Sequence, residues 1–318
     1  MQTKRARAIE PVASNRIDSA LLRRCVCPAT RTAYLDKPDS SRSTLGNLPF
    51  NFMKRREFIK SSVVAAGAGT MAAVIDASGA EKSETAGREF YELRRYHLRR
   101  GPKQRLFDEF YQHAAIPAMV RAGLGPIGVL GVAVGPDSPT MYVLIPHPSM
   151  ESFATANDRV RADPEYRKAG AAFINVTATD PAYVRVESSL MVAIEGVPKL
   201  EVPAAESQSR VFELRTYESH SKLANKKKIE MFNTGELAIF RRTGLRPVFF
   251  GETLIGSRMP NLTYMLTFED MAARERNWRT FAADPEWKKL STTPGFTDPE
   301  IVSNISNLFL RPTAYSQI

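Results

Sequence analysis

The most regular pattern along the chain is a succession of short hydrophobic runs and amphipathic stretches that begins at Phe90. Alternating side chains predict a strand at Phe90–Tyr96, and apolar residues at helical spacing predict a helix at Lys103–Arg121. Turn-forming residues at positions 135–139 separate the next two apolar runs. The other elements expected in this unit are strands at Ile127–Val134 and Thr140–Ile145, a helix at Ser149–Ala162 and a strand at Ala182–Ile194.

The same pattern occurs a second time, 121 residues later. YELRRY around Glu92 returns as FELRTY around Glu213, RAGL returns as RTGL, and DPEY returns as DPEW. Three separated blocks that keep one spacing identify an internal repeat. In each DPE block the aspartate is expected to cap, and the proline to open, a further short helix. The second unit is expected to have helices at Lys222–Thr243 and Asp270–Ala283 and a closing strand near Ile301–Leu310.

Each unit therefore has the element order of a ferredoxin-like α+β domain, βαββαβ. Helices would cover one face of each antiparallel sheet and leave the other face open. Two tandem copies can cover each other's open faces, so the predicted fold is a pseudo-dimeric α+β barrel. The expected boundaries are 88–197 for the first domain, 198–209 for a linker and 210–318 for the second domain.

With these blocks in both copies, the region from Arg88 to Leu310 resembles the NIPSNAP family of the dimeric α+β barrel superfamily. The resemblance implies a tandem-domain bacterial member with the barrel fold. It implies little about activity, because bacterial members of the family have no agreed activity. Superfamily relatives include small monooxygenases and haem-handling enzymes.

The positive charge of the chain is concentrated before the repeats. The formal net charge is +10, of which residues 1–52 carry +5, residues 53–80 carry +2 and the remainder only +3. A nucleic-acid partner is not expected, because the folded body lacks the excess of basic residues that such partners require. Cys25 and Cys27 also lie in the first segment, so neither a disulfide nor a thiolate metal site is expected in the repeats.

Residues 53–80 have the composition of a signal peptide. Arg55 and Arg56 begin the stretch RREFIK, which resembles the twin-arginine export signal. The apolar run that follows is mild and shorter than the 20 or so residues of a spanning helix, so no stable transmembrane segment is expected. Small residues up to Ala80 predict cleavage after that residue. The expected partner is the Tat export machinery, and the expected location is periplasmic or secreted.

An export signal belongs at the start of a protein, yet this one follows 52 polar residues without sustained periodicity. Residues 1–52 are therefore expected to be either a disordered leader or an extension upstream of a true start at Met53.

Candidate chemistry in the repeats lies on the paired strands. Since side chains alternate, one face of each strand carries polar groups, and we expect that face to line the barrel interior as a ligand-binding surface. Arginine would supply a planar donor and glutamate a base. The alternative is a pair of Glu–Arg ion pairs with a structural role, because buried charges need partners. The six residues concerned are Glu92, Arg94, Tyr96, Glu213, Arg215 and Tyr217.

The histidines do not cluster in the sequence. His113, on the first helix and facing the sheet edge, is the best candidate for a haem or metal ligand, with a structural histidine as the alternative. No cofactor is predicted, and haem is the best alternative. The glycines at 123, 125 and 128 match G-x-G-x-x-G, but they follow a helix and precede a strand, which indicates a helix end and turn.

Two classes of function follow from these observations. The first is an exported binding or structural module of the periplasm or cell envelope, with a small molecule or a second copy as partner. The alternative is a small-molecule enzyme with oxygenase-like or haem-handling activity in the barrel cavity. Whether the chain is an enzyme stays open at this point.

Overall fold

The computed structural model describes residue 85 and residues 87–204 and 210–318. The expected leader, the signal segment with Arg55, Arg56 and Ala80, and part of the linker lie outside these residues. The first unit contains, in order, β1 (Phe90–His97), α1 (Pro102–Phe110), the π-helical η1 (Tyr111–Ala115), α2 (Ile116–Arg121), β2 (Gly128–Val134), β3 (Thr140–His147), α3 (Met150–Ala162), α4 (Pro164–Ala169), α5 (Ala171–Ile174) and β4 (Arg185–Ala193).

The second unit repeats this order. It contains β5 (Val211–Glu218), α6 (Lys222–Met231), the π-helical η2 (Phe232–Glu236), α7 (Leu237–Arg242), β6 (Arg246–Ile255), β7 (Asn261–Phe268), α8 (Met271–Ala283), α9 (Pro285–Ser291), α10 (Asp298–Ile301) and β8 (Asn304–Pro312). The two π-helical segments lie 121 residues apart, so the irregularity belongs to the repeat. Such segments are short widenings of an α-helix.

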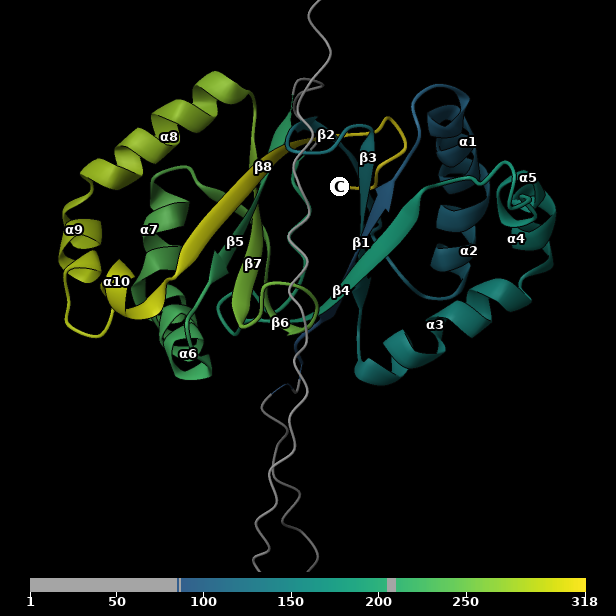
Figure 1. Cartoon of the computed structure of the whole chain (residues 1–318). Helices are drawn as coiled ribbons and strands as arrows, with labels where there is room; N and C mark the ends of the chain where they lie inside the picture. Colours follow the sequence, from purple (N-terminus) through teal and green to yellow (C-terminus); the bar gives the residue numbers. More distant parts are fainter. Residues whose placement is uncertain (1–84, 86, 205–209) are drawn as a thin grey trace, which may run out of the picture. The chain divides into compact units, whose positions relative to one another are not determined.

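The eight strands form one closed barrel with the order β1-β3-β2-β8-β5-β7-β6-β4. All pairs are antiparallel, and the two units are joined by the pairs β2–β8 and β4–β6. Figure 1 shows α1–α5 on one side of the barrel and α6–α10 on the opposite side. The predicted α+β barrel built from two ferredoxin-like units is therefore confirmed.

The helix starts follow from local capping. Asp163 accepts hydrogen bonds from the backbone N–H groups of Glu165 and Tyr166, at 2.9 and 3.2 Å, and α4 begins at Pro164. Asp284 caps α9 in the same way. A side-chain oxygen at this position satisfies N–H groups that have no partner inside the helix. The short helices predicted after both DPE motifs are confirmed.

The barrel interior is an apolar core to which both units contribute. Tyr91 and Leu93 of β1 pack there with Phe212 and Leu214 of β5 and with Phe249 of β6. Two further large cores lie outside the barrel, one between each half of the sheet and its helices, and a small cluster of Phe90, Leu190 and Val192 packs against Phe153 of α3. The interior core therefore holds the two units together, and the outer cores hold the helices.

The prediction of which strand face lines the interior was wrong. Tyr96 packs with Phe107 and Tyr111 of the helices, so Glu92, Arg94 and Tyr96 lie on the outer face of the sheet, beneath the helices. Tyr217 belongs to the corresponding outer core, which places Glu213 and Arg215 on the outer face as well. The physical reason is that β1 and β5 are covered on both faces. Alternation then separates two buried faces without showing which one turns inward.

Candidate functional site

The main candidate site is a pocket of about 490 Å³ between the outer face of the first half of the sheet and helices α1 to α5. Pockets for small organic ligands have volumes of about 300–1,000 Å³. Arg94 and Tyr96 of β1 line the pocket, so two of the predicted residues do face a cavity, on the opposite side of the strand from the one expected. Its apolar walls are formed by Phe110, Met119, Leu124, Val160 and Phe173.

A Glu92–Arg94 pair lies beside this pocket. Arg94 donates from Nε to Oε1 of Glu92 at 2.7 Å and from Nη2 to Oε2 at 2.9 Å. Ser188 also donates to Glu92, and Arg94 makes a further bond to Asn157 at 3.1 Å. Burial alone would raise the pKa of Glu92, but the nearby His147 ring and Arg94 lower it to about 2. The carboxylate is thus ionised and already bound on both oxygens.

Phenol groups surround the pair on the pocket side. Tyr96, Tyr111, Tyr166 and Tyr183 all line the cavity. Burial raises the pKa of Tyr111 well above its ordinary value, and burial also raises the pKa of Tyr166. Both phenols therefore stay protonated at neutral pH and can donate hydrogen bonds to an acceptor on a ligand.

Two arginines stand at the exposed side of the pocket. Arg161 of α3 and Arg167 of α4 both line it and are exposed to solvent. Among the described residues, the side chains of these two arginines have no ion-pair partner. Their charge is therefore available to a ligand, whereas the charge of Arg94 is balanced by Glu92.

The buried histidine of the site is His147, which the sequence did not single out. Its side chain is 1% exposed, and its Nε2 lies 3.6 Å from Oε2 of Glu92. Phe153 packs edge-on against the ring, and neither ring nitrogen has a hydrogen-bond partner in the described part of the chain. The sequence did contain an indication of this residue, because the histidine occurs in the first copy only and the second copy has Phe268 at the equivalent position.

The expected position of His113 was wrong. It lies on the exposed side of η1 and is turned away from the sheet, whereas its neighbours Tyr111 and Ala114 are buried. It is not among the residues that line the pocket. Across the described ranges, no group of three or more His, Cys, Asp or Glu side chains is placed to hold a metal ion.

In the described part of the second half, larger side chains occupy the space that corresponds to this pocket. Among the residues 121 positions later, Phe240 stands where the first half has Met119, and Tyr264 stands where it has Val143. Phe250 stacks on Tyr264 with ring centroids 4.5 Å apart, and both are fully buried. Trp278, in place of Asn157, and Phe281, in place of Val160, complete this aromatic packing.

The Glu213–Arg215 pair of the second half lies beside these aromatic side chains and is bonded to one of them, Trp278. Glu213 accepts hydrogen bonds from Arg215, Arg274, Trp278 and Asn307, all between 2.7 and 3.0 Å. Burial would raise the pKa of Glu213, but these partners lower it to about 2. Five hydrogen bonds engage the carboxylate, three on Oε1 and two on Oε2.

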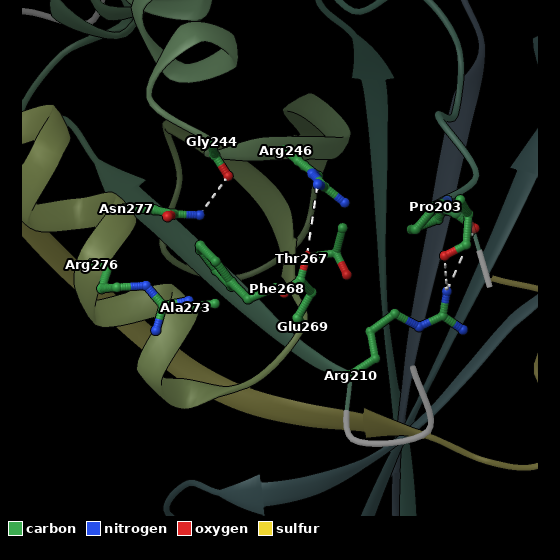
Figure 2. A pocket seen from close by; sticks show the side chains of 11 residues that line it. Pro203, Arg210, Gly244, Arg246, Thr267, Phe268, Glu269, Ala273, Arg276 and Asn277 are labelled. Atoms are coloured by element: carbon green, nitrogen blue, oxygen red, sulfur yellow. Dashed lines mark hydrogen bonds and ion pairs between the residues drawn. The ribbon is translucent and has the colours of Figure 1, made fainter. Parts of the chain in front are cut away.

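A second cleft, shown in Figure 2, lies at the N-terminal end of α8 and has a volume of about 220 Å³. Arg210, Arg246 and Arg276 line it. Arg210 donates weakly to backbone carbonyls of residues 203 and 204, and Arg246 lies 3.9 Å from Glu269. The cleft is smaller than the main pocket, and two of its three arginines are engaged by other groups, so we rank it second.

Comparisons with known proteins identify a family whose model matches both units. The NIPSNAP family model matches residues 91–193 and 212–317, which is one match for each unit. Among curated proteins, none matches the chain.

Similar solved structures have low sequence identity. An uncharacterised NIPSNAP-like domain protein from Burkholderia xenovorans is 22% identical over 34% of this chain and 90% of that chain, with a TM-score of 0.31. A NIPSNAP family protein of unknown function from Agrobacterium tumefaciens is 17% identical over 34% and 90%, with a TM-score of 0.30. A protein from Lactobacillus acidophilus, provisionally named a monooxygenase, is 8% identical over 71% and 94%, with a TM-score of 0.49. At these identities the likeness concerns the fold alone.

Proposed function

The chain belongs to the NIPSNAP family, and we propose that it is a binding protein whose first unit holds a small amphipathic organic anion. The ligand class is a carboxylate or similar acid on an apolar or aromatic body. The single observation that carries the proposal is the asymmetry between the units. The first unit has an open pocket where the second is packed with aromatic side chains.

The chemistry of the pocket fits such a ligand. Its inner walls are apolar and aromatic, and so match a hydrocarbon or ring. Arg161 and Arg167 at the exposed side would pair with the acidic group, where water access keeps the desolvation of both charges small. The protonated phenols of Tyr111 and Tyr166 would donate to any further oxygen on the ligand.

Binding is better supported than proton-transfer chemistry. A general base must have a pKa near the working pH, but Glu92 has a pKa of about 2 and both its oxygens are bound. Self-association through the sheet is also less well supported, because every strand of the closed barrel already has two neighbours. A small molecule is therefore the preferred partner.

An oxygenase-like enzyme is the second candidate, and His147 is the observation that favours it. A buried imidazole next to a carboxylate, at the wall of a pocket, is an arrangement that can accept a proton from a ligand. Haem is not proposed as the cofactor, because His113 faces away from the pocket and the ring of His147 is covered edge-on by Phe153.

A pocket-filling variant tests the proposal. Met119→Phe with Val160→Phe introduces the side chains that the second unit has at these positions, and should abolish binding of decanoate or a naphthoate while the protein stays folded. Arg161→Ala should weaken binding, whereas Arg276→Ala, an exposed arginine of the other cleft, should have no effect. Calorimetry measures affinity, and mass spectrometry of the recovered ligand detects turnover. Unchanged binding in the filled variant would refute the assignment of this pocket, and recovery of an altered ligand would favour the enzyme.

The location of the protein is a separate proposal that rests on the sequence. We propose export through the twin-arginine pathway to the periplasm or cell envelope, because Arg55 and Arg56 precede a mild apolar run and a small-residue site at Ala80. In the part of the chain that the structure describes, no helix is long and apolar enough to cross a membrane. N-terminal sequencing of the protein from its native host should give Glu81 as the first residue. A first residue before Met53 would contradict the export proposal.

A further inference from the structure

The two ends of the barrel interior differ in chemistry. Towards one end the interior is closed by apolar packing around Tyr91, Phe212 and the buried side chain of Ile318. At the other end lies a pocket of about 490 Å³, lined by strands of both units. This barrel-mouth pocket lies on the inner face of the sheet, so the sheet itself separates it from the pocket proposed above.

Six inward-facing side chains form one tier across the mouth. Arg95 of β1 is paired in register with Tyr142 of β3 and with Glu187 of β4. On the opposite side, the corresponding strands β5, β7 and β8 place hydroxyl groups at the same level, with Thr216 in register with Thr263 and with Ser306. All six residues line the pocket. The repeat thus placed an Arg–Tyr–Glu set across from a set of three hydroxyls.

The hydroxyl side is held in place by hydrogen bonds. The hydroxyls of Thr216 and Thr263 lie 3.0 Å apart, and Thr263 donates to Oδ1 of Asn261 at 3.0 Å. Thr253 donates to the same oxygen at 2.6 Å. Asn261 itself is fixed by two bonds from its amide to the backbone carbonyls of residues 257 and 258. A network with this many internal bonds presents its remaining lone pairs in fixed directions.

The charged groups on the other side of the mouth are paired with one another. Arg95 donates to Glu187, which also accepts a bond from Arg185 at 3.0 Å. In this arrangement both guanidiniums share one carboxylate, so each charged group has a counter-charge within reach. A guanidinium or carboxylate that already has its counter-charge can still bond two adjacent hydroxyl groups of a ligand, since each offers more donors or acceptors than one partner uses.

The β6–β7 hairpin extends across the rim. Its residue Arg258 has a φ of 60°, the only positive value at a non-glycine residue in the described ranges. From this position its guanidinium donates to Ser306 of β8 at 2.7 Å. Residues in such sparsely populated conformations persist only when their surroundings hold them, and they are common at ligand sites. The contact fixes the hairpin against the hydroxyl side of the tier.

From these observations, we propose that the barrel mouth is a second ligand site, for a neutral polyhydroxylated molecule of the size of a mono- or disaccharide. Hydroxyl groups both donate and accept, so they match the Thr–Thr–Ser side and the paired Arg–Glu side alike. The ring of Tyr142 and the apolar floor of Leu93, Leu214 and Leu308 offer surfaces for the C–H face of a sugar. An anion would find no unpaired cation inside the tier, which distinguishes this site from the first.

Calorimetric titration of the full chain with glucose, galactose, maltose and myo-inositol tests the proposal. Saturable binding of at least one of them is expected, and Thr216→Val with Thr263→Val should weaken it about tenfold or more, as two lost hydrogen bonds imply. Thr267→Val is the matched control. It lies on the same strand and the same inward face, near the opposite end of the barrel, and its hydroxyl has no partner among the described residues.

Further variants make the result decisive. If the double threonine variant does not fold, Ser306→Ala is tested in its place, and a smaller decrease in sugar affinity is expected. The pocket-filling variant Met119→Phe with Val160→Phe should leave sugar binding unchanged, which separates failure at this site from failure of the proposed anion site. Absence of saturable binding for all four compounds, or equal affinity in the threonine variants, would overturn the proposal. Tighter binding of citrate than of any sugar by the pocket-filling variant, in which the proposed anion site is closed, would also overturn it.

Discussion

The buried ion pair of the second unit allows a quantitative test of how this barrel half is stabilised. Lys228 and Glu236 have side chains 1% and 2% exposed, and Nζ lies 3.0 Å from Oε2. The first unit has Phe107 and Ala115 at these positions, so the pair fills space that the repeat can also fill without charge. Burial lowers the pKa of Lys228, but the charge of Glu236 outweighs it and the pKa is raised. The lysine is therefore protonated when folded.

Glu236→Gln removes one charge while keeping the shape of the side chain. Breaking a buried pair in this way destabilises proteins by about 3–5 kcal/mol, because the remaining charge is left uncompensated. Here we expect the lower end, about 3 kcal/mol, for two reasons. The amide oxygen can still accept from Nζ, and Nζ lies 4.8 Å from the ring centroid of Phe232 and 5.1 Å from that of Tyr217, where the ring faces attract a cation.

Urea unfolding followed by tryptophan fluorescence measures the free energy of unfolding of this variant. Comparison of pH 7 with pH 10 shows whether the loss of stability comes from the uncompensated lysine charge. In the variant, the buried lysine should lose its proton more easily than in the unfolded chain. The unfolded state then binds more protons, so the free energy of unfolding should recover as pH rises. Lys228→Met with Glu236→Leu, which removes both charges, should be within about 1 kcal/mol of the native protein or more stable. A loss below about 1 kcal/mol for Glu236→Gln, or an equal loss for the double variant, would refute this reasoning.

Three further outcomes are expected. The pKa of Glu92 is lowered from 4.5 to about 2, so its ionisation contributes about 3 kcal/mol to the free energy of unfolding above pH 4.5. This contribution is lost as the pH falls towards 2. Urea unfolding of Glu92→Gln at a series of acid pH values should lack this pH-dependent loss of stability. Ser149→Ala removes the side-chain oxygen that accepts from Ser152 N–H at the start of α3 and should lower the free energy of unfolding by about 1 kcal/mol in urea, whereas Ser149→Asn should not. Gly244→Ala should destabilise, because its φ of +82° is unfavourable for alanine and the added methyl would lie 2.9 Å from the Asn277 amide; a thermal midpoint equal to that of the native protein would contradict this.

Much of the fold followed from the sequence because the evidence for it is local or repeated. The strand and helix positions were set by hydrophobic periodicity, and the predicted α3 span, Ser149–Ala162, differs from the observed helix only by its capping residue. The repeat then determined that two equal units were present. Closure of the barrel followed because each unit has one uncovered sheet face that only the other can cover.

The candidate site was predicted only in part. Glu92, Arg94 and Tyr96 were identified, but their face was assigned to the barrel interior instead of the helix side. The open pocket was missed because its empty volume depends on side chains from eight helices and strands at once. A closer comparison of the two copies would have indicated the pocket. Val143 and Asn157 of the first unit are smaller than Tyr264 and Trp278, the residues at the equivalent positions of the second unit.

By itself, the sequence determined the order of elements, the twofold repeat, the caps of the short helices and the paired Glu–Arg motifs. These features depend on residues near one another in the chain or on an exact spacing, so no tertiary contact is needed to see them. Only the tertiary structure decided which strand face turns inward, which unit keeps a cavity and which polar groups meet across the barrel mouth. Those properties arise from packing between residues up to two hundred positions apart. Both faces of β3 and β7 are buried along their whole length, so the burial pattern of these strands does not show which face turns inward.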